Sequence, residues 1–128
     1  MKTTMAKTQS LVRDLDFESI FEAVPSIRFI GVCTTQGKLL DAQYRNGVTP
    51  LLSDRGLQFA VMKSAIRATT RIGENEEVGN PVYSVTMYDN VKRATIPFGD
   101  DLLLLVSFEK NQVESVVMDK ILEFLRND

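Results

Sequence analysis

The most informative hydrophobic pattern in this chain lies between residues 57 and 72, where apolar side chains recur at the spacing of an α-helix. At about 100° per residue they form two adjoining flanks that together cover about 200° of the helix circumference. A helix that packs on one sheet normally needs an apolar stripe of about 100°. One flank can therefore lie on the chain's own sheet, whereas the other requires a partner. The first flank holds Leu57, Val61, Ala65, Ala68 and Ile72, and the second holds Phe59, Met62 and Ile66.

We assign the first flank to contact with a second copy of the chain. Its residues are small or β-branched apart from Leu57, which allows two helices to approach closely. The alternative is that the first or last helix of the same chain covers the exposed flank. The remaining strip of this helix carries Lys63, Arg67 and Arg71 at intervals of four residues, so a partner arriving there meets positive charge. For this strip the alternative is a solvated helix face.

Shorter patterns on either side predict seven further elements. Apolar residues on one face predict a helix over residues 15–24, which Pro25 ends because it disfavours the helical conformation in the residue before it. Ser53 or Asp54 is placed to cap the helix over 57–72, and Gly73 to end it. Strands are predicted over residues 27–33, 39–44, 82–88, 91–98 and 102–108, and a last helix follows.

Turn and capping residues separate these elements. Gln36 and Gly37 lie between the first two strands, and Asp89-Asn90, two residue types that tolerate positive φ, form a tight connection between the third and fourth. Asn111 and Glu114 form a capping box for the last helix. The predicted apolar face of that helix holds Val113, Val117, Ile121, Phe124 and Leu125.

The strands differ in hydrophobicity, which predicts their positions in the sheet. Residues 102–106 read Leu-Leu-Leu-Leu-Val without polar alternation, which is typical of a strand covered on both faces, and residues 27–32 are nearly as apolar. Residues 82–88 alternate with Ser84 and Thr86, as a strand at an open edge does. In the neighbouring strand, Lys92, Arg93 and Pro97 are residue types that oppose pairing with another chain. The pattern therefore predicts an α/β (α+β) fold, a three-layer α/β/α sandwich around a five-stranded antiparallel sheet.

Composition places the chain among small soluble proteins of a reducing compartment. Its 128 residues suit one domain over residues 15–128, preceded by a flexible or partly helical segment over residues 1–14. The net charge of −2 weighs against a nucleic-acid partner. A single cysteine, no signal-peptide pattern and no apolar run long enough to span a bilayer favour a cytoplasmic location without membrane insertion.

The sequence offers no recognised catalytic, cofactor-binding or metal-binding site. It contains no histidine, which removes Ser-His and Cys-His nucleophile pairs and histidine-bearing zinc sites. Cys33 lies in an apolar strand, where simple burial is expected. The run from Gly31 to Leu39 differs from a phosphate-binding loop in its glycine spacing and leads into a strand. The acidic pairs lie in loops or at helix starts, where they favour solubility and capping.

The opening segment of the chain contains Ile20, Val24, Pro25, Ile27 and Gly31, followed by Gln36-Gly37-Lys38-Leu39. Over residues 17–125 the chain resembles the roadblock family of dynein light chains and its bacterial and archaeal relatives. The resemblance rests on the element order α-β-β-α-β-β-β-α, on the opening segment and on the three consecutive strands that end at residues 102–106. It implies a sheet order of 2-1-5-4-3 and a dimer in which third strands pair and central helices lie side by side. Many members regulate or scaffold small Ras-like GTPases, others anchor motor or lysosomal complexes, and they are not usually enzymes.

We therefore expect a non-enzymatic, cytoplasmic homodimer that serves as a scaffold or regulatory protein-binding module, with a small Ras-like GTPase as one candidate partner. A profilin-like or PAS-like small-molecule sensor is the alternative, and an enzyme of unknown chemistry is a third. Glutamate at Ala65 or arginine at Ala68 is expected to weaken the dimer by burying an unpaired charge. The predicted partner-binding residues are Lys63, Arg67 and Arg71. The predicted dimer interface comprises Leu57, Val61, Ala65, Ala68, Ile72, Val82, Ser84, Thr86 and Tyr88.

Overall fold

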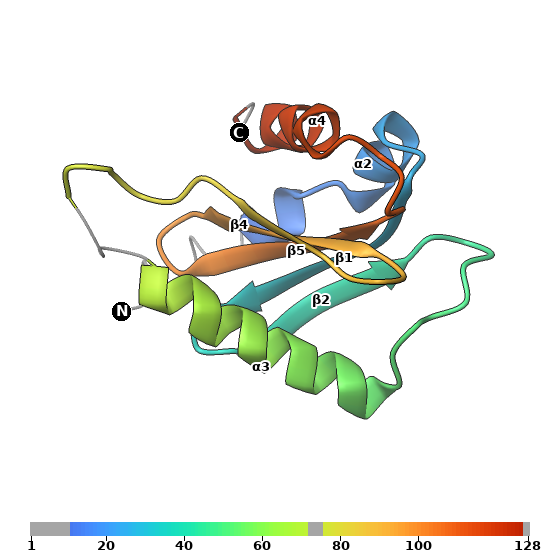
Figure 1. Cartoon of the computed structure of the whole chain (residues 1–128), viewed down its shortest axis with the longest axis horizontal. Helices are drawn as coiled ribbons and strands as arrows, with labels where there is room; N and C mark the ends of the chain where they lie inside the picture. Colours follow the sequence, from blue (N-terminus) through green and yellow to red (C-terminus); the bar gives the residue numbers. More distant parts are fainter. Residues whose placement is uncertain (1–10, 72–75, 127–128) are drawn as a thin grey trace.

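The computed structural model describes residues 11–71 and 76–126. Its element order agrees with the prediction (Figure 1). Residues 11–14 add a short helical turn, separate from the helix that follows. Gly73 and Ile72 lie outside the described residues. The elements are α2 (Phe17–Ala23), β1 (Ile27–Thr34), β2 (Leu39–Tyr44), α3 (Asp54–Arg71), β3 (Ser84–Met87), β4 (Lys92–Phe98), β5 (Leu102–Phe108) and α4 (Glu114–Arg126).

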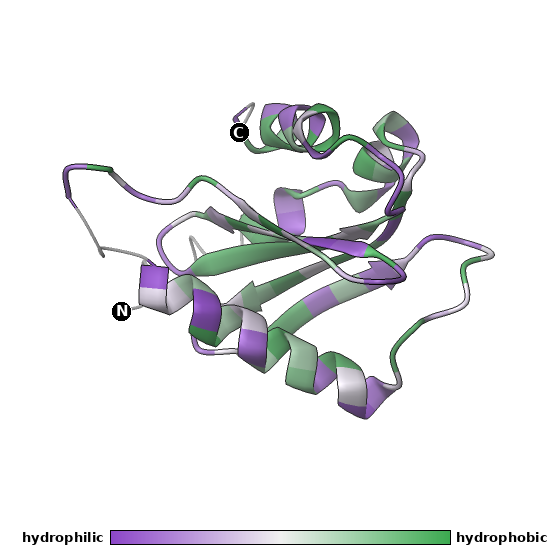
Figure 2. Cartoon of the chain, viewed as in Figure 1, coloured by the Kyte–Doolittle hydropathy of each residue, from purple (hydrophilic) through white to green (hydrophobic). Residues whose placement is uncertain are grey.

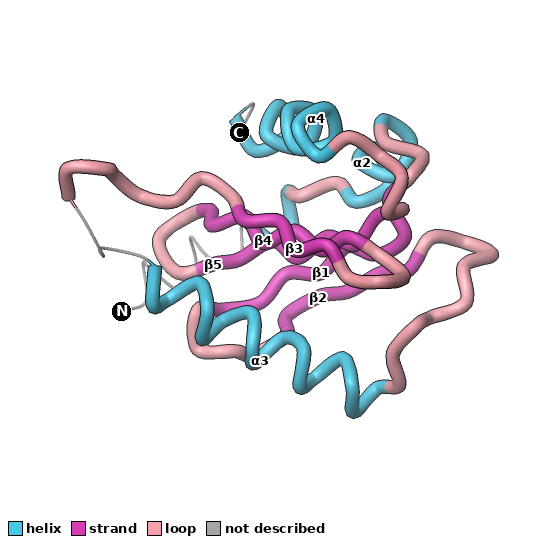
Figure 3. Tube along the Cα trace, in the orientation of Figure 1, coloured by secondary structure: helices cyan, strands magenta, loops and turns pink. Residues whose placement is uncertain are grey.

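The five strands form one antiparallel sheet of order β2-β1-β5-β4-β3, which confirms the predicted order. The two most apolar strands, β1 and β5, lie in the middle, as their lack of polar alternation indicated. Helices α2 and α4 cover one face, whereas in the described part of the chain α3 alone covers the other (Figures 1 and 3). The molecule is therefore a three-layer sandwich whose two helical layers are unequal.

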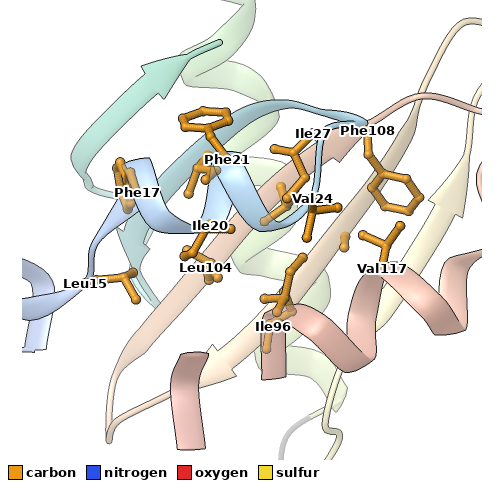
Figure 4. Close-up of a cluster of buried hydrophobic side chains, with 14 of the residues drawn as sticks. Leu15, Phe17, Ile20, Phe21, Val24, Ile27, Ile96, Leu104, Phe108 and Val117 are labelled. Carbon is orange, nitrogen blue, oxygen red and sulfur yellow. The ribbon is translucent and has the colours of Figure 1, made fainter. Parts of the chain in front are cut away.

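The larger core lies between the sheet and helices α2 and α4 (Figure 4). Alternate residues of β5 point into it, because successive side chains of a strand face opposite sides of a sheet. Ile20 from α2 and Ile121 from α4 are fully buried there. Other buried members are Leu15, Phe17, Phe21, Val24, Ile27, Ile30, Val32, Ala94, Ile96, Leu102, Leu104, Val106, Phe108, Val117 and Met118.

The smaller core lies between the sheet and α3. Leu103 and Leu105 of β5 contact it from the sheet, and Val61, Ala65 and Ala68 contact it from the helix. Small helical side chains allow the helix axis to lie close to the strands. Cys33, Phe29 and the partly buried Leu39, Tyr44 and Leu57 complete this cluster.

Capping and turn residues explain where most elements begin and end. The carboxylate of Asp16 accepts hydrogen bonds from the backbone N–H and the hydroxyl of Ser19, and these bonds lower the pKa of Asp16. Ser53, rather than Asp54, caps α3 by accepting the N–H of Gly56 at 3.0 Å. In the β1–β2 turn Gly37 adopts a φ of 89°, a left-handed conformation that favours glycine.

At the β3–β4 hairpin one prediction, the length of β3, is corrected and another, the tight turn, is confirmed. β3 spans only Ser84–Met87, and Val82 lies before it with 56% of its surface exposed. The two-residue hairpin at Asp89-Asn90 does form, with the N–H of Tyr88 donating to the carbonyl of Val91 at 2.8 Å, although no non-glycine residue of the described chain has a positive φ. The strand therefore offers a shorter edge than its alternation suggested.

The start of the last helix is also corrected. α4 begins at Glu114, so Asn111 does not cap it, and Val113 is 64% exposed instead of lying on the apolar face. The Glu114 carboxylate instead pairs with the Nζ of Lys92 at 2.9 Å. Lys92 is only 8% exposed and also donates to the carbonyl of Gln112 at 2.7 Å. Lys92 thus anchors the start of α4 to β4. Because β4 lies between β5 and β3, Lys92 does not protect an edge strand from pairing.

Candidate protein-interaction surface

β3 forms an open edge of the sheet, because among the described residues its only neighbour in the sheet is β4. Hydrogen-bonding direction alternates along an antiparallel strand, and the N–H of Tyr88 points toward β4. The backbone N–H and C=O groups of Val85 and Met87 therefore point away from β4, toward the open side. An edge with free donors and acceptors of this kind can pair with another strand.

The structure places most of the predicted helical interface inside a single chain. Val61, Ala65 and Ala68 are 1%, 2% and 6% exposed, because they pack on the sheet of their own subunit. Leu57 is partly buried against the same cluster, and Ile72 lies outside the described residues. Since these small side chains are already covered, the flank assigned to a second copy is the flank that holds α3 on its own sheet.

The other apolar flank of α3 remains in solvent. Phe59, Met62 and Ile66 are 53%, 51% and 61% exposed. Figure 2 shows hydrophobic and hydrophilic residues following one another along the visible length of α3. The expectation that one chain leaves part of this helix uncovered is therefore correct, but the uncovered residues are those of the second flank.

A groove of about 480 Å³ lies between α3 and the sheet, and it extends from Phe29 of β1 and Tyr44 of β2 to the β3 edge. Its helical wall contains Ala60, Ser64, Arg67 and Arg71, which follow one side of α3 at intervals of three or four residues. Its sheet side includes three residues of the predicted interface, namely Ser84, Thr86 and Tyr88. The groove thus joins the open edge and one side of α3 into a continuous surface.

Arginine side chains line this groove and contact its polar and aromatic groups, and one of them, Arg71, reaches across it. Arg71 donates to the hydroxyl of Ser84 at 3.2 Å, and Arg67 donates to that of Ser64 at 3.5 Å. The guanidinium of Arg93 lies 5.0 Å from the centre of the Tyr88 ring, a cation–π distance. Lys63 does not line the groove, so the predicted basic strip is divided between two sides of the helix.

Sequence reasoning missed Ala60, Ser64 and Arg93 as part of this surface. A signal for the first two exists, because small residues four positions apart mark a helix side that another helix can approach closely. Arg93 gives no such signal. Its position becomes visible only once β4 is known to be paired with β3, with Arg93 opposite Thr86.

The described residues contain no group of three or more His, Cys, Asp or Glu side chains that could hold a metal ion.

Burial raises the pKa of the Cys33 thiol to about 11, which keeps it protonated and unreactive at neutral pH. The pKa of Tyr44, beside the groove, is raised by burial and by the Asp54 carboxylate, against the opposing effect of Arg93. No helix among the described residues is both long and apolar enough to cross a membrane.

Comparison with solved structures identifies the fold. A Roadblock/LC7 domain from Streptomyces avermitilis superposes with a TM-score of 0.68 at 10% identity, over 86% of this chain and 88% of that one. MglB of Myxococcus xanthus gives 0.67 at 10% identity, over 91% and 89%. An MglB structure described as having a tetrameric arrangement gives 0.63 at 12% identity, over 93% and 90%.

No family model and no curated protein matches the sequence. At these low identities the structural likeness establishes the fold alone. The chain therefore has the roadblock fold, which confirms the resemblance inferred from its residues.

Proposed function

We propose that this chain is a non-enzymatic homodimeric scaffold of the cytoplasm that binds another protein. The observation that carries the proposal is the open β3 edge lying beside a groove whose helical wall contains Ala60 and Ser64. One contact with a second copy can pair the edge strands and fill the groove with the second α3. The surface is therefore self-complementary, as a two-fold dimer interface must be.

Edge pairing follows from the free backbone groups of β3. Two antiparallel copies of this strand centred on Thr86 would place Val85 of one copy opposite Met87 of the other. The outward N–H and C=O groups of these residues would then bond to each other. If the two-fold axis instead passes beside Val85, Val85 of one copy lies opposite Val85 of the other, which is the second possible register. Either register extends the two five-stranded sheets into one continuous sheet.

Helix pairing uses the groove side of α3. Ala60 and Ser64 leave room for the second helix, which lies antiparallel to the first around a two-fold axis. The C-terminal half of one helix, with Arg67 and Arg71, then faces the N-terminal half of the other, whose first turn contains Asp54. This arrangement keeps the like charges of the two copies apart and brings opposite charges closer.

The likeness to roadblock proteins supports the assembly in two ways. The resemblance to roadblock proteins implies pairing of third strands, and a structural neighbour, MglB, is described as having a tetrameric arrangement.

For the protein partner we propose contact with Lys63, which lies outside the groove that the second copy fills. Arg67 and Arg71, predicted from sequence for the same partner, line that groove and are assigned to the dimer contact. A small Ras-like GTPase is the partner that the resemblance implies. A pull-down that compares wild type with the Lys63→Glu variant, which leaves the groove unchanged, tests this contact. Equal capture of every partner by both proteins would contradict it.

Disulfide trapping tests the dimer. In a Cys33→Ala background, cysteine at Thr86 or at Val85 should form an intermolecular disulfide under mild oxidation, depending on the register. Cysteine at exposed Ser115 of α4 is the matched control and should not crosslink. Absence of crosslinking at both β3 positions, or crosslinking at Ser115 alone, would contradict the edge-paired dimer.

A small-molecule sensor is the second candidate function, because the groove volume of about 480 Å³ falls within the range of ligand sites. Native mass spectrometry of the purified protein distinguishes the two functions. A ligand retained by the monomer, and lost in an Arg93→Gln variant, would favour the sensor. A dimer that carries no additional mass supports the scaffold.

A further inference from the structure

The exposed residues Phe59, Met62 and Ile66 lie on the side of α3 opposite the groove. On a helical wheel with about 100° per residue, the mean direction of these three side chains lies about 125° from that of the buried flank. The mean direction of the groove wall lies about 95° from the buried flank, on its other side. A second copy seated in the groove therefore leaves these residues in solvent. We call Phe59, Met62 and Ile66 the outer seam.

The outer seam has the spacing with which one helix contacts another. Its residues occur at positions i, i+3 and i+7, which are successive a, d and a positions of a heptad. Along the helix this seam is about 10 Å long, or two turns. Its members are each more than half exposed, although α3 is firmly packed on its other side. A partner would thus meet a rigid, preformed ridge.

The charges around the outer seam are positive. Lys63 occupies an e position beside it, Arg55 precedes Phe59 by one turn, and both are exposed. The β1–β2 turn lies against Met62, since a Cβ added at Gly37 would be 3.5 Å from its Cα, and the following residue is Lys38. After Asp54, α3 contains no carboxylate.

We propose that the outer seam binds an acidic amphipathic α-helix of another protein. Apolar a and d residues of that helix pack on Phe59, Met62 and Ile66, and its e or g carboxylates face Lys63 and Arg55. A second copy of this chain is a poor occupant, because a symmetric contact would bring Lys63 near its own counterpart. A seam of three residues is also short for holding the protein on a lipid surface. The proposal specifies the partner's chemistry within the proposed scaffold function, but binding at this seam does not require the dimer.

A fluorescent peptide tests the proposal. The probe is a synthetic helix of about 21 residues with Leu at a and d and Glu at e and g, and fluorescence anisotropy measures its affinity for the full chain. Binding should weaken about tenfold or more in Ile66→Asp and by a smaller factor in Lys63→Glu. Val116→Asp, at a similarly exposed apolar residue of α4, is the matched control and should leave binding unchanged. Circular dichroism confirms that each variant is folded.

Four results would overturn the proposal. The first two are no binding of the peptide, and equal binding of a peptide with Lys in place of Glu at e and g. The third is that the protein binds anionic vesicles through Ile66 but does not bind the peptide, and the fourth is that wild type forms a larger assembly that the Ile66→Asp substitution dissociates. Light scattering on the same samples separates this proposal from the dimer. A monomer that binds the peptide would contradict the dimer alone, and a dimer that ignores it would contradict the outer seam alone.

Discussion

The guanidinium of Arg71, the last residue of α3, donates a hydrogen bond of 3.2 Å to the hydroxyl of Ser84, the first residue of β3. This bond crosses the groove from its helical wall to the open edge of the sheet. It therefore helps to fix the spacing between the two parts of the surface that we propose for dimerisation. A rigid, preformed surface loses less conformational freedom when a second copy binds.

Proline at Met87 should weaken the dimer without unfolding the chain. The N–H of Met87 points to the open side, so its loss leaves the β3–β4 ladder intact but removes a donor for a second strand. Met87→Ala, which retains the N–H, is the control. Light scattering should give a lower average mass for the proline variant only. A dimer of unchanged strength in Met87→Pro would exclude pairing through this edge.

Charges placed on two sides of α3 should have different effects. Ser64→Glu lies in the groove wall and should weaken the dimer while changing the free energy of unfolding by only about 0.5 kcal/mol. Ala65→Glu buries a carboxylate against the chain's own sheet and should destabilise each subunit by about 3–5 kcal/mol. Urea denaturation and light scattering together check both expectations. A folded, stable Ala65→Glu monomer would contradict this assignment of the two sides.

The contrast between these two positions shows what the sequence could and could not predict. The unbroken apolar run of β5 correctly predicted a central strand, because no other position buries both faces of a strand. The two apolar flanks of α3 were also visible. Periodicity alone does not say which flank faces the sheet, however, since both are hydrophobic. The choice depends on how closely Val61, Ala65 and Ala68 let the helix approach Leu103 and Leu105, which is a property of the assembled core.

Local sequence patterns also do not predict which of two possible partners a charged side chain binds. Glu114 fits a capping box in sequence, yet in the fold its carboxylate is taken by Lys92 from a strand more than 20 residues away. Ser84, Thr86 and Tyr88 line the groove together, as expected for alternate positions along an extended segment. Arg93 joins them only through strand pairing, which no local pattern encodes.

Removing the partner of Lys92 should destabilise the fold moderately. Glu114→Gln removes the charged partner of a largely buried ammonium group, which still donates to the Gln112 carbonyl at 2.7 Å. The loss should be about 1 kcal/mol, because the Glu114 carboxylate is about half exposed. Lys92→Met removes the charge while keeping the aliphatic stem, and should be close to neutral. Thermal or urea denaturation measures both. A larger loss in Lys92→Met than in Glu114→Gln would be inconsistent with this account.

The Cys33 thiol should make stability fall at alkaline pH. Its pKa is raised by burial from 9.0 to about 11, so the unfolded chain loses this proton first as the pH rises. The contribution of the thiol is fully present below about pH 9 and is progressively lost as the pH rises toward 11. Urea denaturation between these values should show a smaller decrease for Cys33→Ala than for wild type. Parallel pH profiles would show that the buried thiol has no such effect.

The mass of the wild-type protein in solution tests the central claim most directly. Size-exclusion chromatography with light scattering across the micromolar range should give twice the 14.4 kDa of one chain. A single species of 14.4 kDa at every concentration would contradict the proposed dimer, and with it the function assigned to the open β3 edge and its groove.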